Sequence, residues 1–196
     1  MFETRIHGRG GQGVVTAAEL LSIAAFVEGR HAQAFPSFGS ERMGAPVVAY
    51  CRIADREIRL REPVLEPDAL IVQDPTLLHQ VDVFSGLVRD GYMLINTTRS
   101  FEQLGIEELT RELDPTRLGT VPATELALEH VGRPVPNAAL LGGFAAITGR
   151  VTLDAVSAAI RERFSGRVAT GNVMAATRAY EHVCTSLREP SHAQAD

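Results

Sequence analysis

The residues with the clearest chemical potential form a cluster of glycines near the start of the chain. The stretch from Gly8 to Gly13 reads Gly-Arg-Gly-Gly-Gln-Gly and joins a short extended segment to a strongly helical one. A strand, a glycine turn and a helix in this order form the phosphate-binding unit of many α/β proteins. Glycines let the backbone bend sharply, and the unpaired N–H groups at the start of a helix attract anions. This glycine turn therefore predicts an anion-binding site.

Six residues of the glycine turn are candidate ligand contacts: Gly8, Arg9, Gly10, Gly11, Gln12 and Gly13. Their spacing alone is a weak signal, because a chain with 17 glycines often shows such a spacing by chance. The prediction therefore depends on the position of these residues between a strand and a helix. Arg9 could hold a phosphate with its forked guanidinium or contact a partner subunit. Gln12 could donate its amide to a phosphate or lie in solvent. His7, in the alternating part of the first strand, is interpreted as a hydrogen-bonded core residue without a catalytic role.

The segment after the first helix argues against a dinucleotide site of the usual kind. Such a site needs an acidic residue at the end of the second strand, about 20 residues beyond the glycines, to bind the ribose hydroxyls. The predicted second strand, His31–Phe35, has no acid at its end, and Glu41 lies inside the following loop. The glycine turn therefore does not predict an NAD site.

A second set of candidate contacts lies in the loop from Pro36 to Pro46. Ser37, Ser40 and Arg42 place two hydroxyls and one guanidinium within six residues. Phe38 could stack on an adenine or anchor the loop. A loop at the carboxyl end of a strand in an open α/β sheet borders the ligand crevice, so we expect this loop to face the glycine turn. Contact with another subunit is an equally good interpretation of the same residues.

Two further apolar runs, Ala69–Asp74 and Gly91–Thr98, are predicted to be buried strands with polar ends. Asn96 could contact a ligand or cap the next segment. Asp74 followed by Pro75 is typical of a helix N-cap, and the helix is predicted to continue to Val88.

The other elements give the fold class. A helix is predicted over Val14–Gly29, and a β-hairpin over Pro46–Ile53 and Glu57–Leu60. A short strand at Leu118–Pro122 precedes four predicted helices, which are Ala123–His130, Pro136–Thr148 with Asn137 as N-cap, Thr152–Phe164 and Ala169–Leu187. The Gly142–Gly143 pair lets another element pack close or lets its helix bend. We predict an α/β fold: a three-layer, Rossmann-like, mostly parallel sheet with an added antiparallel hairpin and C-terminal helices.

Composition limits the classes of function. With 196 residues, 45% of them apolar, the chain can bury a full core, and we expect one domain over residues 1–187 with a flexible tail over 188–196. The 19 basic and 24 acidic residues give a net charge of −5 without a long basic run, so nucleic-acid binding is not expected. The sequence shows no secretory signal and no apolar stretch of membrane-spanning length, which predicts a cytoplasmic location without membrane contact.

Two stretches together resemble one protein family. His7–Gly13 and Phe35–Pro46 are similar to the matching parts of the gamma subunit, or gamma domain, of the 2-oxoacid:ferredoxin oxidoreductases, the pyruvate synthase group. The resemblance spans roughly residues 3 to 185, is strongest up to Pro75 and leaves out the tail from Arg188. Members of this family decarboxylate a 2-oxoacid on thiamine diphosphate, pass the electrons through iron–sulfur clusters and transfer the acyl group to coenzyme A.

The resemblance implies that the chain is one subunit of such an enzyme and is inactive alone. It implies alpha-, beta- and delta-type partner subunits, with ferredoxin or a flavin subunit as electron acceptor. Thiamine diphosphate, magnesium and 4Fe-4S clusters belong in those partners, since this chain has two cysteines, Cys51 and Cys184, and no recognisable G-D-G thiamine motif. In the family the gamma domain is thought to close over the coenzyme A site. The glycine turn and the loop after Pro36 are therefore expected to contact coenzyme A, mainly through backbone N–H groups.

Two other functions remain open at this point. The chain could be a purely architectural subunit whose glycine turn serves only interfaces. It could also be a free-standing Rossmann oxidoreductase that uses NAD, although the missing acid after the second strand argues against this. In the subunit interpretation, the pocket that selects the 2-oxoacid belongs to other chains.

Overall fold

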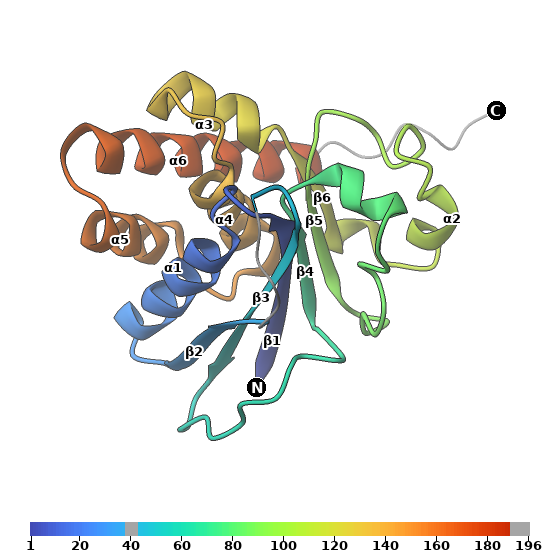
Figure 1. Cartoon of the computed structure of the whole chain (residues 1–196), viewed down its shortest axis with the longest axis horizontal. Coiled ribbons are helices and arrows are strands. Elements are labelled where there is room, and N and C mark those ends of the chain that lie inside the picture. Colours follow the sequence, from blue (N-terminus) through green and yellow to red (C-terminus); the bar gives the residue numbers. More distant parts are fainter. Residues whose placement is uncertain (38–42, 189–196) are drawn as a thin grey trace.

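A sheet of six strands lies at the centre of the computed structural model, which describes residues 1–37 and 43–188. Phe38, Ser40 and Arg42, like the predicted tail from residue 189 on, lie outside the described residues. The strands are β1 (Phe2–Arg9), β2 (His31–Pro36), β3 (Pro46–Ala54), β4 (Ala69–Val72), β5 (Tyr92–Asn96) and β6 (Leu118–Val121). Their order across the sheet is β2-β3-β1-β4-β5-β6 (Figure 1).

Most of the sheet is parallel. β1, β4, β5 and β6 run parallel to one another, and Ile6 of β1 pairs with Ile71 of β4. β3 runs antiparallel between β1 and β2, so β2 points in the same direction as β1. The carboxyl ends of β1, β2, β4, β5 and β6 therefore meet at one edge of the sheet. The predicted α/β class with a mostly parallel sheet is confirmed.

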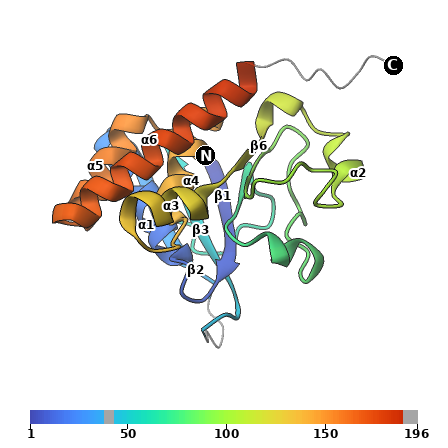
Figure 2. The same cartoon turned by 90° about the horizontal axis from the view of Figure 1, so that it is seen from above.

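The two faces of the sheet are covered differently. The helices are α1 (Val14–Val27), α2 (Glu107–Thr110), α3 (Ala123–Val131), α4 (Asn137–Thr148), α5 (Leu153–Arg163) and α6 (Gly166–Arg188), with short 3₁₀ helices η1 (Pro75–His79) and η2 (Pro115–Arg117). The long helices gather on one side of the sheet, and η1, α2 and loops lie on the other (Figures 1 and 2). Leu94 of β5 enters the core under the helices, whereas Met93 and Ile95 enter the smaller core under the loops. Side chains of the sheet thus alternate between a core under the helices and a core under the loops, and the fold has three layers.

The first crossover helix forms as the sequence predicts. Its residues are good helix formers and apolar on most sides, and α1 is buried between the sheet and α5. Gly29 follows the helix with φ of +77°, a conformation that a side chain disfavours, and ends it. α1 thus carries the chain from the end of β1 over the sheet to β2.

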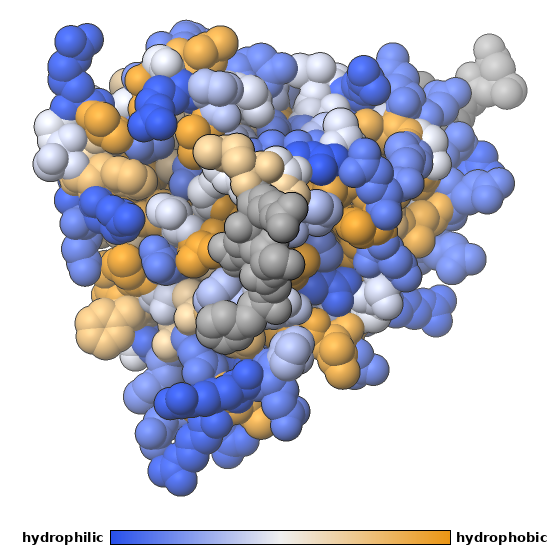
Figure 3. Space-filling view, in the orientation of Figure 1, coloured by the Kyte–Doolittle hydropathy of each residue, from blue (hydrophilic) through white to orange (hydrophobic). Residues whose placement is uncertain are grey.

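The molecular surface mixes residue types. On the face in Figure 3, hydrophilic residues surround smaller groups of hydrophobic ones. Exposed apolar side chains such as Phe26 and Leu65 lie on separate segments, the end of α1 and the approach to β4. Within the described residues, no helix is both long enough and apolar enough to cross a membrane.

The predicted hairpin between Pro46–Ile53 and Glu57–Leu60 is wrong. Residues 46–54 form β3, but residues 57–60 form no strand. Both edges of β3 are already paired, with β1 and with β2, so a further strand has no free backbone groups to join. The antiparallel hairpin of this fold consists instead of β2 and β3, connected by residues 37–45.

The helix predicted to continue to Val88 ends at His79. Asp74 caps η1 at its start, as predicted, but the chain then leaves helical geometry. The carbonyl group of Ser85 accepts a hydrogen bond from the buried guanidinium of Arg5 on β1. In a continuous helix, the carbonyls of this segment would bind later N–H groups instead. The hydrogen bond from Arg5 therefore takes the place of helical hydrogen bonding in this segment.

Candidate functional site

The glycine turn lies where the topology of the sheet changes direction. From β1 the chain crosses through α1 to β2 on one side, and β4 pairs with the other side of β1. In open α/β sheets, ligands bind at the carboxyl ends of the strands at such a point. The carboxyl ends of β1 and β4 are therefore the expected place for a ligand, and residues 10–13, which join β1 to α1, lie there.

Two glycines of the turn have backbone conformations that other residues rarely adopt. Gly11 has φ of +98° and Gly13 has φ of +74°. Gly13 is the N-cap of α1, which has neither a side-chain cap nor an acidic residue in its first turn. The positive end of this helix is thus not neutralised by its own side chains, as a site for an anion requires.

Gly8 is needed for close packing. A Cβ atom at this position would lie 2.6 Å from Cγ2 of Val14 and 3.1 Å from Cβ of Gln73. Real Cβ atoms essentially never show a contact as short as the first, and the second is tighter than most, so a glycine lets the start of α1 approach the ends of β1 and β4 without a shift. Gly8 thereby shapes the turn without exposing itself to a ligand.

The structure brings the two sequence motifs together. The N–H of Gly10 donates to the carbonyl of Ala45 at 2.9 Å, and the N–H of Gly44 donates to the carbonyl of Gly10 at 3.1 Å. At the other end of the loop, the N–H of half-buried Ser37 donates to the carbonyl of Val48. The predicted juxtaposition of the loop and the glycine turn is confirmed for the described residues.

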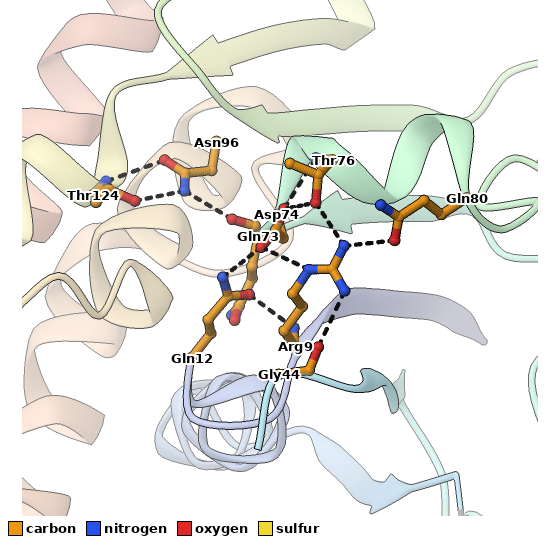
Figure 4. Close-up of polar contacts among 9 residues, drawn as sticks. All are labelled: Arg9, Gln12, Gly44, Gln73, Asp74, Thr76, Gln80, Asn96 and Thr124. Atoms are coloured by element: carbon orange, nitrogen blue, oxygen red, sulfur yellow. Dashed lines mark hydrogen bonds and ion pairs between the residues drawn. The ribbon is translucent and has the colours of Figure 1, made fainter. Parts of the chain in front are cut away.

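The side chain of Arg9 is engaged within the protein rather than free for a ligand. Its Nη2 donates to Oγ1 of Thr76 at 2.7 Å and to Oε1 of Gln80 at 2.6 Å, and its Nη1 donates to the carbonyl of Gly44 at 3.1 Å. Its Nε lies 3.2 Å from a carboxylate oxygen of Asp74. One guanidinium thus joins the glycine turn, the loop before β3, and η1 (Figure 4).

Gln12 is held in the same network. Its Oε1 accepts the N–H of Arg9 at 2.8 Å, and its Nε2 donates to Asp74 at 2.7 Å. Burial alone would raise the pKa of the Asp74 carboxyl, but hydrogen bonds from Thr76 and Gln12 and the nearby Arg9 charge outweigh it and lower the pKa. Asp74 is therefore an anion at neutral pH and the centre of this network.

Asparagine in place of Asp74 tests the network. Asparagine caps a helix about as well as aspartate, so Asp74→Asn keeps the N-cap but loses the ion pair with Arg9 and the acceptor of Gln12. We expect the free energy of unfolding to fall by about 2 kcal/mol, measured by urea denaturation. Asp114 begins an identical Asp-Pro-Thr turn at η2, where its carboxylate has a single, longer ion pair with Arg117 at 3.6 Å and no glutamine partner among the described residues, so Asp114→Asn is the control with the smaller loss. Equal losses would show that the network contributes nothing.

Asn96, at the end of β5, caps α3, the helix that follows the neighbouring strand β6. Its Oδ1 accepts the N–H of Thr124 in the first turn of α3 at 3.1 Å. Its Nδ2 donates to Oγ1 of Thr124 and to the carbonyl of Gln73, both at 2.8 Å (Figure 4). Of the two predicted roles, the geometry supports capping, because the polar atoms of this side chain already have partners.

Two buried amides at the site were not predicted as site residues. Gln73 is fully buried, and neither polar atom of its side chain has a hydrogen-bond partner among the described residues. Figure 4 shows it beside Gln12, at the turn. The only sequence signal was its place, a polar residue ending an apolar strand.

The second amide belongs to Asn137, and its predicted role is wrong. Pro136 occupies the N-cap position of α4, because its fixed φ of −76° already fits the helix, and Asn137 becomes the first helical residue. Nδ2 of Asn137 reaches the carbonyl of Gly13 at 3.5 Å. α4 is thereby linked to the N-cap of α1.

His7 is a structural residue, as predicted. Its Nε2 accepts a hydrogen bond from Nε of Arg5 at 3.0 Å, which requires a neutral ring, since the guanidinium can only donate. Burial and, after it, the positive charge of Arg5 lower the pKa of His7 to about 4. His7 is thus unprotonated at neutral pH and contributes no acid to the site.

Metal-binding side chains do not gather at this site. In residues 1–37 and 43–188, no three His, Cys, Asp or Glu residues are grouped so that they could hold a metal ion. Cys51 is buried in β3 and Cys184 lies on α6, and both are free thiols.

Comparison with known proteins gives a consistent family. The family described as pyruvate ferredoxin/flavodoxin oxidoreductase matches residues 3–182. The pyruvate/ketoisovalerate oxidoreductases common subunit gamma of Pyrococcus abyssi is 49% identical to this chain over 181 residues, which are 92% of this chain and 96% of that protein.

Solved structures agree in fold. The pyruvate oxidoreductase subunit PORC of Thermotoga maritima superposes with a TM-score of 0.78 at 37% identity, over 92% of this chain and 96% of that one. The 2-oxoglutarate:ferredoxin oxidoreductase of Magnetococcus marinus, solved with 2-oxoglutarate, coenzyme A and succinyl-CoA bound, gives a TM-score of 0.71 at 14% identity. That match covers 94% of this chain and 31% of the larger one, and it shows likeness of fold alone.

Proposed function

This chain belongs to the pyruvate ferredoxin/flavodoxin oxidoreductase family, and we propose that it is the gamma subunit of a multi-subunit 2-oxoacid oxidoreductase. The family match over residues 3–182 carries this proposal, because it takes in both the glycine turn and the loop before β3. The relative from Pyrococcus abyssi, named a common subunit gamma, matches over nearly its whole length.

In the proposed complex, a 2-oxoacid loses carbon dioxide, two electrons pass to ferredoxin or through a flavin subunit to NAD, and coenzyme A receives the acyl group. Alpha-, beta- and delta-type subunits hold thiamine diphosphate, magnesium and the 4Fe-4S clusters. The two cysteines of this chain are too few for a cluster with four thiolate ligands, which supports that division. We place the complex in the cytoplasm.

The part of this chain in the reaction is to hold coenzyme A. The phosphates of coenzyme A lie at the start of α1. There the positive end of the helix is not neutralised by its own side chains, and the N–H groups after Gly13 favour negative charge. Arg9 and Gln12 fix the shape of the turn, since their polar atoms bind the protein itself. Ser37, with Phe38, Ser40 and Arg42 of the same loop, remains a predicted contact. Positioning of the thiol, rather than acid–base chemistry, is the contribution to rate.

A charge placed in the first turn of α1 tests the coenzyme A contact. Thr16 is half-buried in that turn. Glutamate there suits the helix itself, because acids stabilise helix starts, but it repels a bound phosphate. In the assembled complex, we expect Thr16→Glu to raise the KM for coenzyme A about tenfold, with the KM for the 2-oxoacid unchanged.

Thr16→Gln is the control, because it has the size of glutamate without its charge. It should leave the KM for coenzyme A within about twofold of the wild-type value. If both variants behave like wild type, coenzyme A does not contact this helix end. Together with an unaffected Arg42→Ala variant, that result would favour the architectural role.

Subunit membership is tested separately. Expressed together with the alpha-, beta- and delta-type chains of the proposed complex, the protein should copurify with them and be needed for acyl-CoA formation. A purified chain that is monomeric and oxidises a substrate unaided would contradict the proposal. Fluorescence titration with NADH tests the remaining alternative, for which we expect no saturable binding.

A further inference from the structure

A cleft lies beside the glycine turn, above the ends of β4, β5 and β6. Its volume is about 630 Å³, a size that suits a small-molecule ligand. η1 forms one wall, the segment after β5 forms another, and the start of α3 closes the third side. Thr76 and Gln80, which bind Arg9 on the side of the glycine turn, form the border between the two sites.

The hydrogen-bond acceptors of this cleft are largely occupied by the protein. Oε1 of Gln80 accepts from Arg9 at 2.6 Å, and Oε1 of Gln103 accepts the N–H of Ser100 at 3.0 Å. Both amide orientations are fixed, because a guanidinium and a backbone N–H can only donate. Oγ1 of Thr97 accepts the N–H of Arg99 at 3.0 Å. These side chains therefore turn their acceptors away from a ligand.

The side-chain groups of the cleft without a hydrogen-bond partner among the described residues are mainly hydrogen-bond donors. Each glutamine has an Nε2 group, and neither group binds another of the described residues. Arg99 lines the cleft and is exposed, and within the described part of the chain its guanidinium has no ion-pair or hydrogen-bond partner. The negative charge in the lining is the carboxylate of Glu125, in the first turn of α3. Besides the hydroxyl of Thr98 and the ring of His79, which is hydrogen-bonded to the carbonyl of Leu104, the lining thus presents one guanidinium and two amide donors against a single carboxylate.

We propose that this cleft binds the phosphate group of a phosphorylated small molecule of sugar-phosphate to nucleotide size. Arg99 supplies the charge, and Gln80 and Gln103 supply N–H groups to phosphate oxygens. The remaining volume holds the body of the molecule. The proposal stands on the chemistry of the cleft and does not depend on the coenzyme A contact at α1.

Inorganic phosphate is the probe for the site. The full chain, labelled with ¹⁵N, is titrated with phosphate against chloride at equal ionic strength. We expect saturable shifts of the backbone N–H signals of Thr97, Thr98 and Thr124, which line the cleft. No saturable shift of these signals, or the same shift with chloride, overturns the proposal.

Two charge variants and one control test whether the charges of the cleft determine its affinity for phosphate. Arg99→Gln should weaken phosphate binding about tenfold, and Glu125→Gln should strengthen it a few-fold, since one removes attraction and the other repulsion. Arg167→Gln makes the same charge change as Arg99→Gln on an exposed residue of α6, which begins beside α5 and away from this cleft (Figure 1). It should leave binding unchanged. Equal weakening by the two arginine variants would mean a general charge effect and no site.

The phosphate ester could come from two sources, and one further comparison separates them. If the cleft holds the 3′-phosphate of coenzyme A itself, coenzyme A shifts these signals and 3′-dephospho-coenzyme A does not. If it holds a separate regulator, neither does, while free phosphate still binds; both results uphold the phosphate site. Failure of the α1 proposal shows separately, as an unchanged KM for coenzyme A in Thr16→Glu.

Discussion

Alanine in place of Gly142 is expected to destabilise the fold by about 3 kcal/mol, although alanine is the better helix former. A Cβ atom at this position would lie 1.9 Å from the carbonyl oxygen of Ala176. That oxygen belongs to the backbone of α6, so relief requires the two helices to separate. Because α4 also packs against β5 and β6, the separation would open the main core.

Its neighbour provides the matched control. A Cβ atom at Gly143 would lie 3.0 Å from Cγ2 of Val121 and 3.1 Å from Cδ2 of Leu94, which are side chains that can move by a few tenths of an ångström. Gly143→Ala should therefore change stability by less than about 1 kcal/mol, since helix propensity offsets the crowding. Urea denaturation of both variants checks this. Similar stabilities for the pair would contradict the close helix crossing as the cause.

The stability of the protein is expected to fall by about 3 kcal/mol through His7 alone as the pH drops from 7 to 4. The pKa of His7 is lowered in the folded protein to about 4, first by burial and then by Arg5, from an ordinary value of 6.5. Between these two values the unfolded chain binds more protons than the folded one. The contribution is thus fully present above pH 6.5 and is lost as the pH falls towards 4.

His7→Gln isolates this effect, because glutamine still offers an oxygen to Nε of Arg5 but does not titrate. Unfolding free energies of both proteins are measured in urea between pH 7.5 and pH 4. The wild-type value should lose about 3 kcal/mol relative to the variant over that range. Parallel curves would show that His7 is not held neutral by its surroundings.

Local chemistry made several elements predictable. α1 was visible because a glycine turn precedes a long run of helix formers, and the capping of η1 was visible in Asp74 followed by Pro75. The juxtaposition of the loop with the glycine turn followed from where strands end in an open α/β sheet. The hairpin after β3 and the helix through Val88 were wrong, since distant partners took the backbone groups that local pairing would have used.

The sequence by itself determined the α/β class, the glycine turn with its bare helix end, and the family that the two motifs indicate. Only the tertiary structure decided that Arg9 and Gln12 bind the protein instead of pointing at a ligand. Their partners, Gly44, Asp74 and Thr76, lie 35 to 67 positions further along the chain. Which of these distant groups meet depends on the order of strands in the sheet, and strand order is set by burial of the whole core rather than by neighbouring residues.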